Sequence, residues 1–316
     1  MEASDAGPTR ERPAGVTPLT ITVVLGLAAA ALLGVGFVAQ QHAAYTEPLG
    51  EMLRLRLLLD LIHKPLWLGG LGAMIAGQVL GALALHRTDV ARVEPLLATN
   101  LIFALAMAAA VYRERLGRWE WLGAVLVSGG VAAFLLSGEP HSGGPPVSAS
   151  VVWVAMLVTL LTAAGLVVVA VRVTLPIKAM LLAAAAGILY GIQDVLTRDS
   201  LVRMGRTGHG PAWLLTTWQP YTLIMVAVVG LLLSQSAFDA APLRVSLPAA
   251  TAAEPIIGIV LGVAILGERL RVDPPALAGE VAGLIALVTG IVILGRSPFL
   301  AKSEQGASRR PERRQK

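Results

Sequence analysis

The sequence predicts an all-α, polytopic integral membrane protein with about nine membrane-spanning helices arranged as two inverted repeats. Apolar residues make up 55% of the 316 residues, charged residues only 14%, and the mean hydropathy is +0.72. A soluble domain has about 25% charged residues, so this composition indicates a membrane protein. Apolar blocks long enough to cross a bilayer recur along the chain, and a short motif that follows one such block occurs twice.

Each crossing requires about 20 mainly apolar residues. The predicted spans cover residues 18–39, 65–85, 93–111, 119–136, 151–171, 177–195, 213–233, 246–264 and 276–294. The segment 45–64 is rich in leucine, but Arg54, Arg56, Asp60 and Lys64 interrupt it. We therefore expect an interfacial helix or a degenerate half-span there. If this segment crossed the membrane, the protein would have ten spans.

These spans divide the chain into five parts. A polar N-terminal tail (1–17) precedes the first repeat (18–138), a Gly/Pro/Ser-rich linker (139–150), the second repeat (151–296) and a basic tail (297–316) that we expect to be disordered. The N-terminal tail lacks the cationic region of a signal peptide, so we expect the first span to be retained. The distribution of Lys and Arg among the loops predicts a plasma-membrane protein with an outside N-terminus and a cytoplasmic C-terminus.

Glu254-Pro255 lies near the middle of an apolar run and is the most informative polar feature of the chain. A carboxylate at the centre of a spanning helix costs about 2.5–3.5 kcal/mol. Pro255 removes a backbone donor, so we expect a kink or a break in the helix there. Either Glu254 is satisfied by backbone groups at a proline bend, or it belongs to a transport pathway. We favour the pathway, because hydrocarbon offers an idle carboxylate no water.

Two motifs, Arg-Glu-Arg-Leu at 113–116 and Gly-Glu-Arg-Leu at 267–270, each close an apolar block and precede a glycine-spaced one. Aligning these motifs places Asn100 opposite Glu254. Aligning Glu94 on Glu254 is the alternative, and it fits the glycine-spaced blocks. We prefer the first alignment for the earlier helix of each pair, since loops absorb extra residues more readily than helices of fixed membrane length. The two halves then cross the membrane in opposite directions, as in many secondary transporters.

This pattern of a proline-bearing helix, a Glu-Arg-Leu motif and a glycine-spaced helix, present twice, resembles the drug/metabolite transporter superfamily with its EamA-type repeats. More narrowly, residues 63–136 resemble the NIPA-like branch, which includes proposed magnesium transporters. The resemblance covers most of residues 18–296 and implies a helical bundle with a central cavity and no bound nucleotide. The chain departs from the ten-helix pattern of this superfamily, because the charged segment 45–64 stands where a second helix is expected.

Polar residues within the predicted spans are the candidate substrate-binding residues. They are Glu254, Asn100, Gln78, Gln219, Gln193, Asp194 and Glu94. Gln219-Pro220 adds a second proline in the middle of a predicted span, where the freed carbonyls need new partners. Glu94 and Asp194 lie nearer the predicted helix ends, where headgroup water or arginines could satisfy them.

Glycines spaced four residues apart recur within the spans. Packing is the favoured interpretation of such pairs, because small residues allow helices to approach closely. The pairs are at 77 and 81, 187 and 191, 258 and 262, and 279 and 283.

Several other function classes are excluded by the residues present. The chain has no Walker A motif, no His-Glu-x-x-His zinc motif, no Gly-x-Ser-x-Gly nucleophile elbow and no cysteine. We therefore predict no catalytic residue, no cofactor, no metal-ligating set and no enzyme activity. The net charge of +5 arises in loops and the tail, so we expect no nucleic acid partner. The expected partners are the lipid bilayer and a small-molecule or ion substrate, with a homodimer as an open alternative.

Three hypotheses follow. In the first, the protein is a secondary transporter in which Glu254 carries a proton or binds a cation, and Asn100 is its neutral counterpart. In the second, the cargo is Mg²⁺, which prefers carboxylates plus retained waters, so Glu254 would converge with Glu94 or Asp194. In the third, the protein is a non-transporting membrane scaffold, with Glu254 and Asn100 in helix contacts and no aqueous cavity between the halves.

Overall fold

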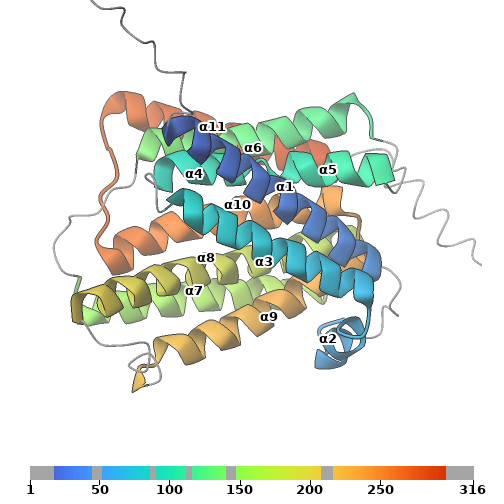
Figure 1. The fold of residues 1–316 in the computed structure, drawn as a ribbon, viewed down its shortest axis with the longest axis horizontal. Coiled ribbons are helices and arrows are strands. Elements are labelled where there is room, and N and C mark those ends of the chain that lie inside the picture. Colours follow the sequence, from blue (N-terminus) through green and yellow to red (C-terminus); the bar gives the residue numbers. More distant parts are fainter. Residues whose placement is uncertain are drawn as a thin grey trace, which may run out of the picture.

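The computed structural model describes residues 18–44, 52–85, 90–111, 116–139, 147–207 and 216–296. In these ranges the regular elements are all helices, and the long ones are stacked side by side along one common direction (Figure 1). Within them, eight helices are long and apolar enough to cross a bilayer, and Pro95–Val111 is a shorter apolar helical stretch. The predicted all-α, polytopic membrane fold is therefore confirmed. The helices are α1 (Pro18–Ala44), α2 (Leu55–Leu61), α3 (Pro65–Leu85), α4 (Val90–Leu97), α5 (Asn100–Val111), α6 (Arg118–Gly138), α7 (Ala149–Ala170), α8 (Leu175–Thr207), α9 (Gln219–Ala240), α10 (Leu243–Leu261) with a π-helical turn η3 (Gly262–Leu266), and α11 (Pro274–Gly295).

The start of α9 differs from the prediction. This helix begins at Gln219, so Pro220 lies in its first turn and not in the middle of a span. Proline is favoured there, because the first N–H groups of a helix have no intrahelical acceptor in any case. The prediction of a mid-span proline at Gln219-Pro220 was wrong. The other boundaries agree within a few residues, except that α1 and α8 are longer than predicted.

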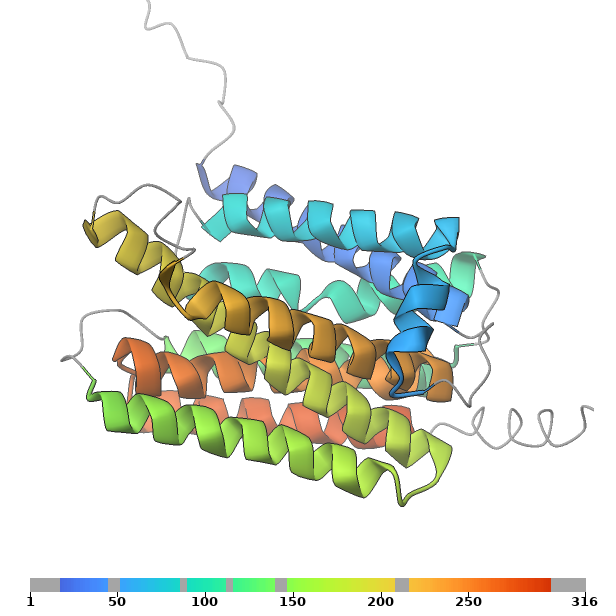
Figure 2. The same ribbon diagram turned by 90° about the horizontal axis from the view of Figure 1, so that it is seen from below.

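The charged segment contains a short helix, α2, that does not cross the bundle. It lies across one end of the long helices (Figure 2). Its Leu57 and Leu61 are fully buried, whereas Arg56 and Asp60 face outward and approach each other to 3.8 Å. With seven residues, α2 is too short to cross an apolar core of about 30 Å. Residues 45–51 of this segment lie outside the described ranges.

The helices that carry Asn100 and Glu254 differ in continuity. α10 runs unbroken through Pro255 and leaves α-helical geometry only at η3, so the predicted break at Pro255 is not observed. Its counterpart in the first half is interrupted between α4 and α5, and Asn100 is the first residue of α5. The alignment had predicted that Asn100 lies in mid-helix. In the structure it lies at the start of a helix instead.

Helices α6 and α11 pack antiparallel through matched glycines. A Cβ atom added at Gly130 would lie 2.6 Å from the Gly283 carbonyl oxygen, and one added at Gly283 would lie 2.7 Å from the Gly130 carbonyl oxygen. Gly123 and Gly290 approach each other in the same reciprocal way. Such reciprocal contacts are the signature of a twofold relation between two equivalent helices. They fit an inverted repeat in which α6 corresponds to α11.

A second set of glycines identifies the counterparts of α1 and α5. A Cβ atom at Gly34 of α1 would lie 2.9 Å from the Asn100 carbonyl oxygen, and one at Gly191 of α8 would lie 2.7 Å from the Glu254 carbonyl oxygen. Moreover, α1 packs against α3 and α5 as α8 packs against α9 and α10. Helix α1 therefore corresponds to α8, and Asn100 corresponds to Glu254.

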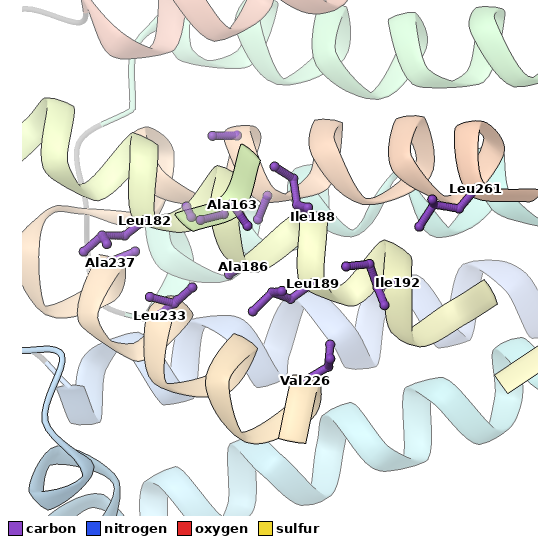
Figure 3. Packing of buried hydrophobic residues seen from close by; sticks show 14 of the residues in the cluster. Ala163, Leu182, Ala186, Ile188, Leu189, Ile192, Val226, Leu233, Ala237 and Leu261 are labelled. Atoms are coloured by element: carbon purple, nitrogen blue, oxygen red, sulfur yellow. The ribbon is translucent and has the colours of Figure 1, made fainter. Parts of the chain in front are cut away.

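This correspondence corrects the expectation about the missing helix. In the described part of the chain it is α7, the first helix of the second half, that lacks a counterpart. The charged segment with α2 lies in the connection between α1 and α3. The second half uses its additional helix to enlarge its core, where Ala163 of α7, Leu182 and Ile188 of α8 and Leu233 of α9 belong to one buried cluster (Figure 3).

Candidate functional site

A cavity of about 550 Å³ lies between the two halves. Five of the predicted residues line it: Gln78, Asn100, Gln193, Asp194 and Glu254. Its remaining walls are mainly apolar side chains of α1, α3 and α9. The lining residues of this kind include Leu33, Phe37, Leu71, Met74, Ile75, Val79, Ala82, Ala227 and Leu231. The tertiary structure thus gathers side chains from six helices of both repeats around one space.

Glu254 lines this cavity from α10. It is half-buried on α10 and also lines a smaller neighbouring cavity of about 50 Å³, which it shares with Gln78 and Asn100. One turn earlier, the Thr251 hydroxyl donates to Asn100 Oδ1 at 3.5 Å and so connects the two halves. Because Pro255 has no N–H, the Thr251 carbonyl also lacks its usual intrahelical donor. One turn before Glu254, α10 therefore has a carbonyl that can accept a hydrogen bond from a group outside the helix.

The interruption between α4 and α5 is stabilised by side-chain hydroxyls. Thr99 Oγ1 donates to the Leu96 carbonyl at 2.6 Å, and Ser128 Oγ of α6 donates to the Ala98 carbonyl at 2.8 Å. These bonds satisfy carbonyls that a broken helix would otherwise leave in hydrocarbon. The break allows α5 to start at Asn100, beside Glu254. The positive end of the α5 dipole favours a negative charge at this point.

One face of α8 supplies a further polar group that the sequence analysis missed. Tyr190 lines the cavity, and its hydroxyl lies 3.0 Å from Ser234 Oγ of α9. Tyr190, Gln193 and Asp194 are spaced three and four residues apart, so they share one helical face. This spacing was the signal that could have identified Tyr190. The Gln193 amide oxygen is buried and has no hydrogen-bond partner.

Two predicted residues are not part of this cavity as described. Gln219 is buried at the start of α9, where its Nε2 lies 3.5 Å from Asp199 Oδ2, and it does not contribute to the lining. The Glu94 side chain lies outside the described part of the structure, although its backbone belongs to α4. Among the described residues, no group of three His, Asp or Glu side chains is arranged to hold a metal ion.

At one end, contacts between the halves close the cavity. The Gln235 amide nitrogen donates to Gln40 Oε1 at 2.6 Å, and Trp67 Nε1 donates to Gln235 Oε1 at 3.1 Å. The Phe37 and Phe238 rings meet edge to face with centroids 6.1 Å apart. We call these five residues the closed end. They join α1 and α3 of the first half to α9 of the second half, and Gln40, Trp67, Gln235 and Phe238 are almost completely buried.

Comparisons with known proteins agree with this architecture. The EamA-like transporter family matches residues 12–136. An uncharacterised protein of Corynebacterium glutamicum, Cgl0250/cg0304, is 31% identical over 292 residues, covering 90% of this chain and 98% of that protein. A probable 4-amino-4-deoxy-L-arabinose-phosphoundecaprenol flippase subunit, ArnE of Pseudomonas fluorescens, is 32% identical over 114 residues, covering 35% of this chain and 94% of that protein.

No solved structure matches the chain. The narrower resemblance to the NIPA-like branch stays a prediction. The matched relatives and the two-halved helical bundle lead to one conclusion: the chain belongs to the EamA-like transporter family, within the drug/metabolite transporter superfamily.

Proposed function

We propose that this protein is a secondary, ATP-independent transporter of a small solute that binds in the cavity between the two halves. The observation that carries the proposal is that Glu254 and Asn100, at equivalent positions of two inverted repeats, line the same cavity. Substrate sites at the interface of inverted repeats are typical of secondary transporters. The cavity also favours transport over the scaffold hypothesis, which expects no such space between the halves.

Glu254 would exchange a proton for a substrate group. A carboxylate in hydrocarbon is costly, so an ionised Glu254 favours the entry of a proton or a positively charged group. Asn100 offers an amide at the equivalent position without a second charge. Rocking of the halves around this site would expose Glu254 to each side of the membrane in turn. One of the similar proteins is named as a probable flippase subunit, and flipping a lipid is also a membrane transport activity. This similarity supports a transport function.

Replacement of Glu254 by Gln tests this proposal. We expect Glu254→Gln to lower pH-gradient-driven transport in proteoliposomes at least about tenfold, equal to about 1.4 kcal/mol of lost transition-state stabilisation. The measurement is a screen of metabolites and divalent cations with and without a pH gradient. The matched control is Glu280→Gln on α11, which does not line the cavity. Full activity of Glu254→Gln, or no transport of any solute by the wild type, would contradict the proposal.

The orientation follows from the positive-inside rule, which places basic loops in the cytoplasm. Basic residues are concentrated at the end of the bundle where α1 and α11 end. They are Arg54, Arg56, Lys64, Arg118, Arg172, Lys178, Arg244 and Arg296. The opposite end carries Arg198, Arg269 and Arg271 among the side chains that the structure describes. We therefore propose a plasma-membrane protein with a cytoplasmic C-terminus and with the closed end on the cytoplasmic side.

Mg²⁺ transport is the second candidate, and the shared cavity of Glu254 and Asp194 favours it. Mg²⁺ is commonly held by one or two carboxylates while it keeps several waters. If Mg²⁺ is the cargo, Asp194→Asn and Glu254→Gln should each lower Mg²⁺ uptake into dye-loaded liposomes, whereas Glu280→Gln should not. If wild-type liposomes take up no Mg²⁺, this candidate is lost while transport of organic solutes stays open.

A further inference from the structure

We infer that the cavity admits its substrate sideways from the lipid, between α3 and α9, and that this substrate is a membrane-resident amphiphile with an amine head group. The inference rests on the proposed function and specifies its substrate class. It depends on three features of the cavity: where its wall is open, how deep that opening lies in the membrane, and which groups face the inside.

The opening lies along the edges of α3 and α9. Ile75 and Val79 of α3 line the cavity, yet they are 58% and 53% exposed. Ala82, one turn further along the same face of α3, is exposed as well, and Ala227 and Leu231 of α9 form the facing edge. We call these five residues the mouth. α3 packs on α1, α9 packs on α8, and the two make little direct contact with each other.

The mouth lies at the level of the hydrocarbon. α3 has 21 residues, which at about 1.5 Å per residue span the apolar core of about 30 Å. Ile75 is at the centre of this helix, and Ala227 and Leu231 lie near the centre of α9. Exposed side chains at this depth face lipid tails. A strictly polar solute would lose its hydration there, whereas an amphiphile already resides in this layer.

The polar groups inside the cavity select the head group. They include the Glu254 carboxylate, the Asn100 amide and the Gln193 amide oxygen, which is buried without a partner. None of the described residues that line either cavity is Lys, Arg or His. A protonated amine supplies both the hydrogen-bond donors and the positive charge that such a lining favours. An anionic head group would find no positively charged side chain there.

The volume of the cavity indicates how the molecule is accommodated. Pockets of about 300–1,000 Å³ hold a drug-sized ligand, and this cavity measures about 550 Å³. Its apolar walls on α1, α3 and α9 continue outward to the mouth. The amine head therefore lies at Glu254, and an apolar chain extends past Val79 towards the lipid.

Binding of dodecylamine to the protein in lipid nanodiscs tests the inference. Radiolabelled dodecylamine is titrated at pH 7, where its amine is protonated, and binding to empty nanodiscs is subtracted. We expect saturable binding that unlabelled propylamine or dodecanol displaces at least about tenfold less effectively, because each lacks one half of the amphiphile. Glu254→Gln should weaken binding by a similar factor.

Two variants that narrow the mouth, Val79→Trp and Ile75→Trp, should also weaken binding about tenfold or more. Leu83→Trp is the matched control, since Leu83 is a 49% exposed residue of α3 that does not line the cavity. Thermal unfolding of each variant verifies its fold.

The outcomes separate the inference from the proposed function. If propylamine competes as well as dodecylamine, or if both mouth variants bind like Leu83→Trp, entry from the lipid is refuted while transport through the cavity stands. If Glu254→Gln binds dodecylamine unchanged, the amine head group is refuted. If binding behaves as expected but no solute crosses proteoliposomes, the proposed transport function fails and the binding site remains.

Discussion

Glu254 and Asn100 occupy equivalent positions, but their surroundings differ. Glu254 lies within the continuous helix α10, where Gly191 allows α8 to approach its backbone closely. Asn100 lies at the first residue of α5, after a break stabilised by Thr99 and Ser128. An amide and not a second carboxylate at the Asn100 position limits the cost of burying charge, since two adjacent carboxylates would repel each other. The amide at the equivalent position preserves hydrogen bonding without that repulsion.

A different acidic residue, Asp273, directly precedes the apolar span of α11 and stabilises the start of this helix. Its carboxylate accepts a hydrogen bond from the Ala276 N–H at 2.9 Å and pairs with Arg271 Nε at 2.6 Å. The hydrogen bond from the Ala276 N–H lowers the pKa of Asp273, and the hydrogen bond from the Arg271 guanidinium lowers it further. In turn, the Asp273 carboxylate raises the pKa of Arg271. Because the pKa of Asp273 is lowered, its stabilising effect is present above about pH 3.9 and is lost as the pH falls through the lowered value.

We therefore expect Asp273→Ala to lower the unfolding temperature at pH 7 and to have less effect near pH 3. Asp273→Asn should retain part of the stability, since asparagine also caps helices well. The measurement is thermal unfolding in detergent or nanodiscs. Glu139→Gln serves as the control, because its contact with Arg271 is longer, at 3.4 Å, and exposed. Equal unfolding temperatures for wild type and Asp273→Ala at pH 7 would refute the cap.

At the scale of elements, α6 and α11 hold the two halves together through glycine backbones. Gly130 and Gly283 are in reciprocal contact, and Gly123 and Gly290 repeat the arrangement further along the same pair of helices. In a membrane, helix association depends on close packing and on hydrogen bonds, because lipid tails are as apolar as leucine side chains. Because these four glycines have no side chains, the backbones of α6 and α11 approach each other closely. We call this glycine contact the seam.

The sensitivity of this seam can be tested at adjacent residues. Gly130→Ala introduces a Cβ atom 2.6 Å from the Gly283 carbonyl oxygen, whereas Gly129 has nothing within 4 Å. We expect Gly130→Ala to destabilise the protein by about 1–3 kcal/mol, as overpacked cores do. Gly129→Ala should be neutral or stabilising by up to about 1 kcal/mol, since alanine is the better helix former. Thermal or denaturant unfolding distinguishes them, and equal stability of the two variants would refute the close packing.

At the scale of the whole molecule, the two halves meet around a cavity that is shut at one end. The closed end joins α1 and α3 to α9 through Gln40, Gln235 and Trp67, and Leu57 and Leu61 of α2 are buried in the adjoining apolar cluster. Interhelical hydrogen bonds in membrane proteins contribute only about 0.6 kcal/mol on average. Contacts of this strength can hold the closed end and still separate during the transport cycle that we propose.

Cross-linking of the closed end provides the test. The chain has no cysteine, so the double variant Gln40→Cys/Gln235→Cys offers a single pair of reactive sites. Treatment with a short bifunctional thiol reagent should stop transport of the solute found in the liposome screen, and cleavage of the linker should restore it. The two single variants, treated in the same way, are the controls. Undiminished transport by the cross-linked protein would show that the closed end does not need to open.

Much of this organisation could be predicted from the sequence, because the bilayer imposes strong local rules. Hydrocarbon requires helices of a fixed length, so the positions of the long apolar helices and of the short helix α2 follow from the distribution of apolar and charged residues. A mid-membrane carboxylate is costly, and that cost singled out Glu254. The tertiary structure decided what local rules do not determine: that α1 corresponds to α8, that the interruption lies at Asn100 and not at Pro255, that Gln219 lies apart from the cavity, and that Tyr190 and the mouth belong to it. These features depend on which helix faces pack together, and apolar residues look the same in the sequence whether they face lipid, another helix or a cavity.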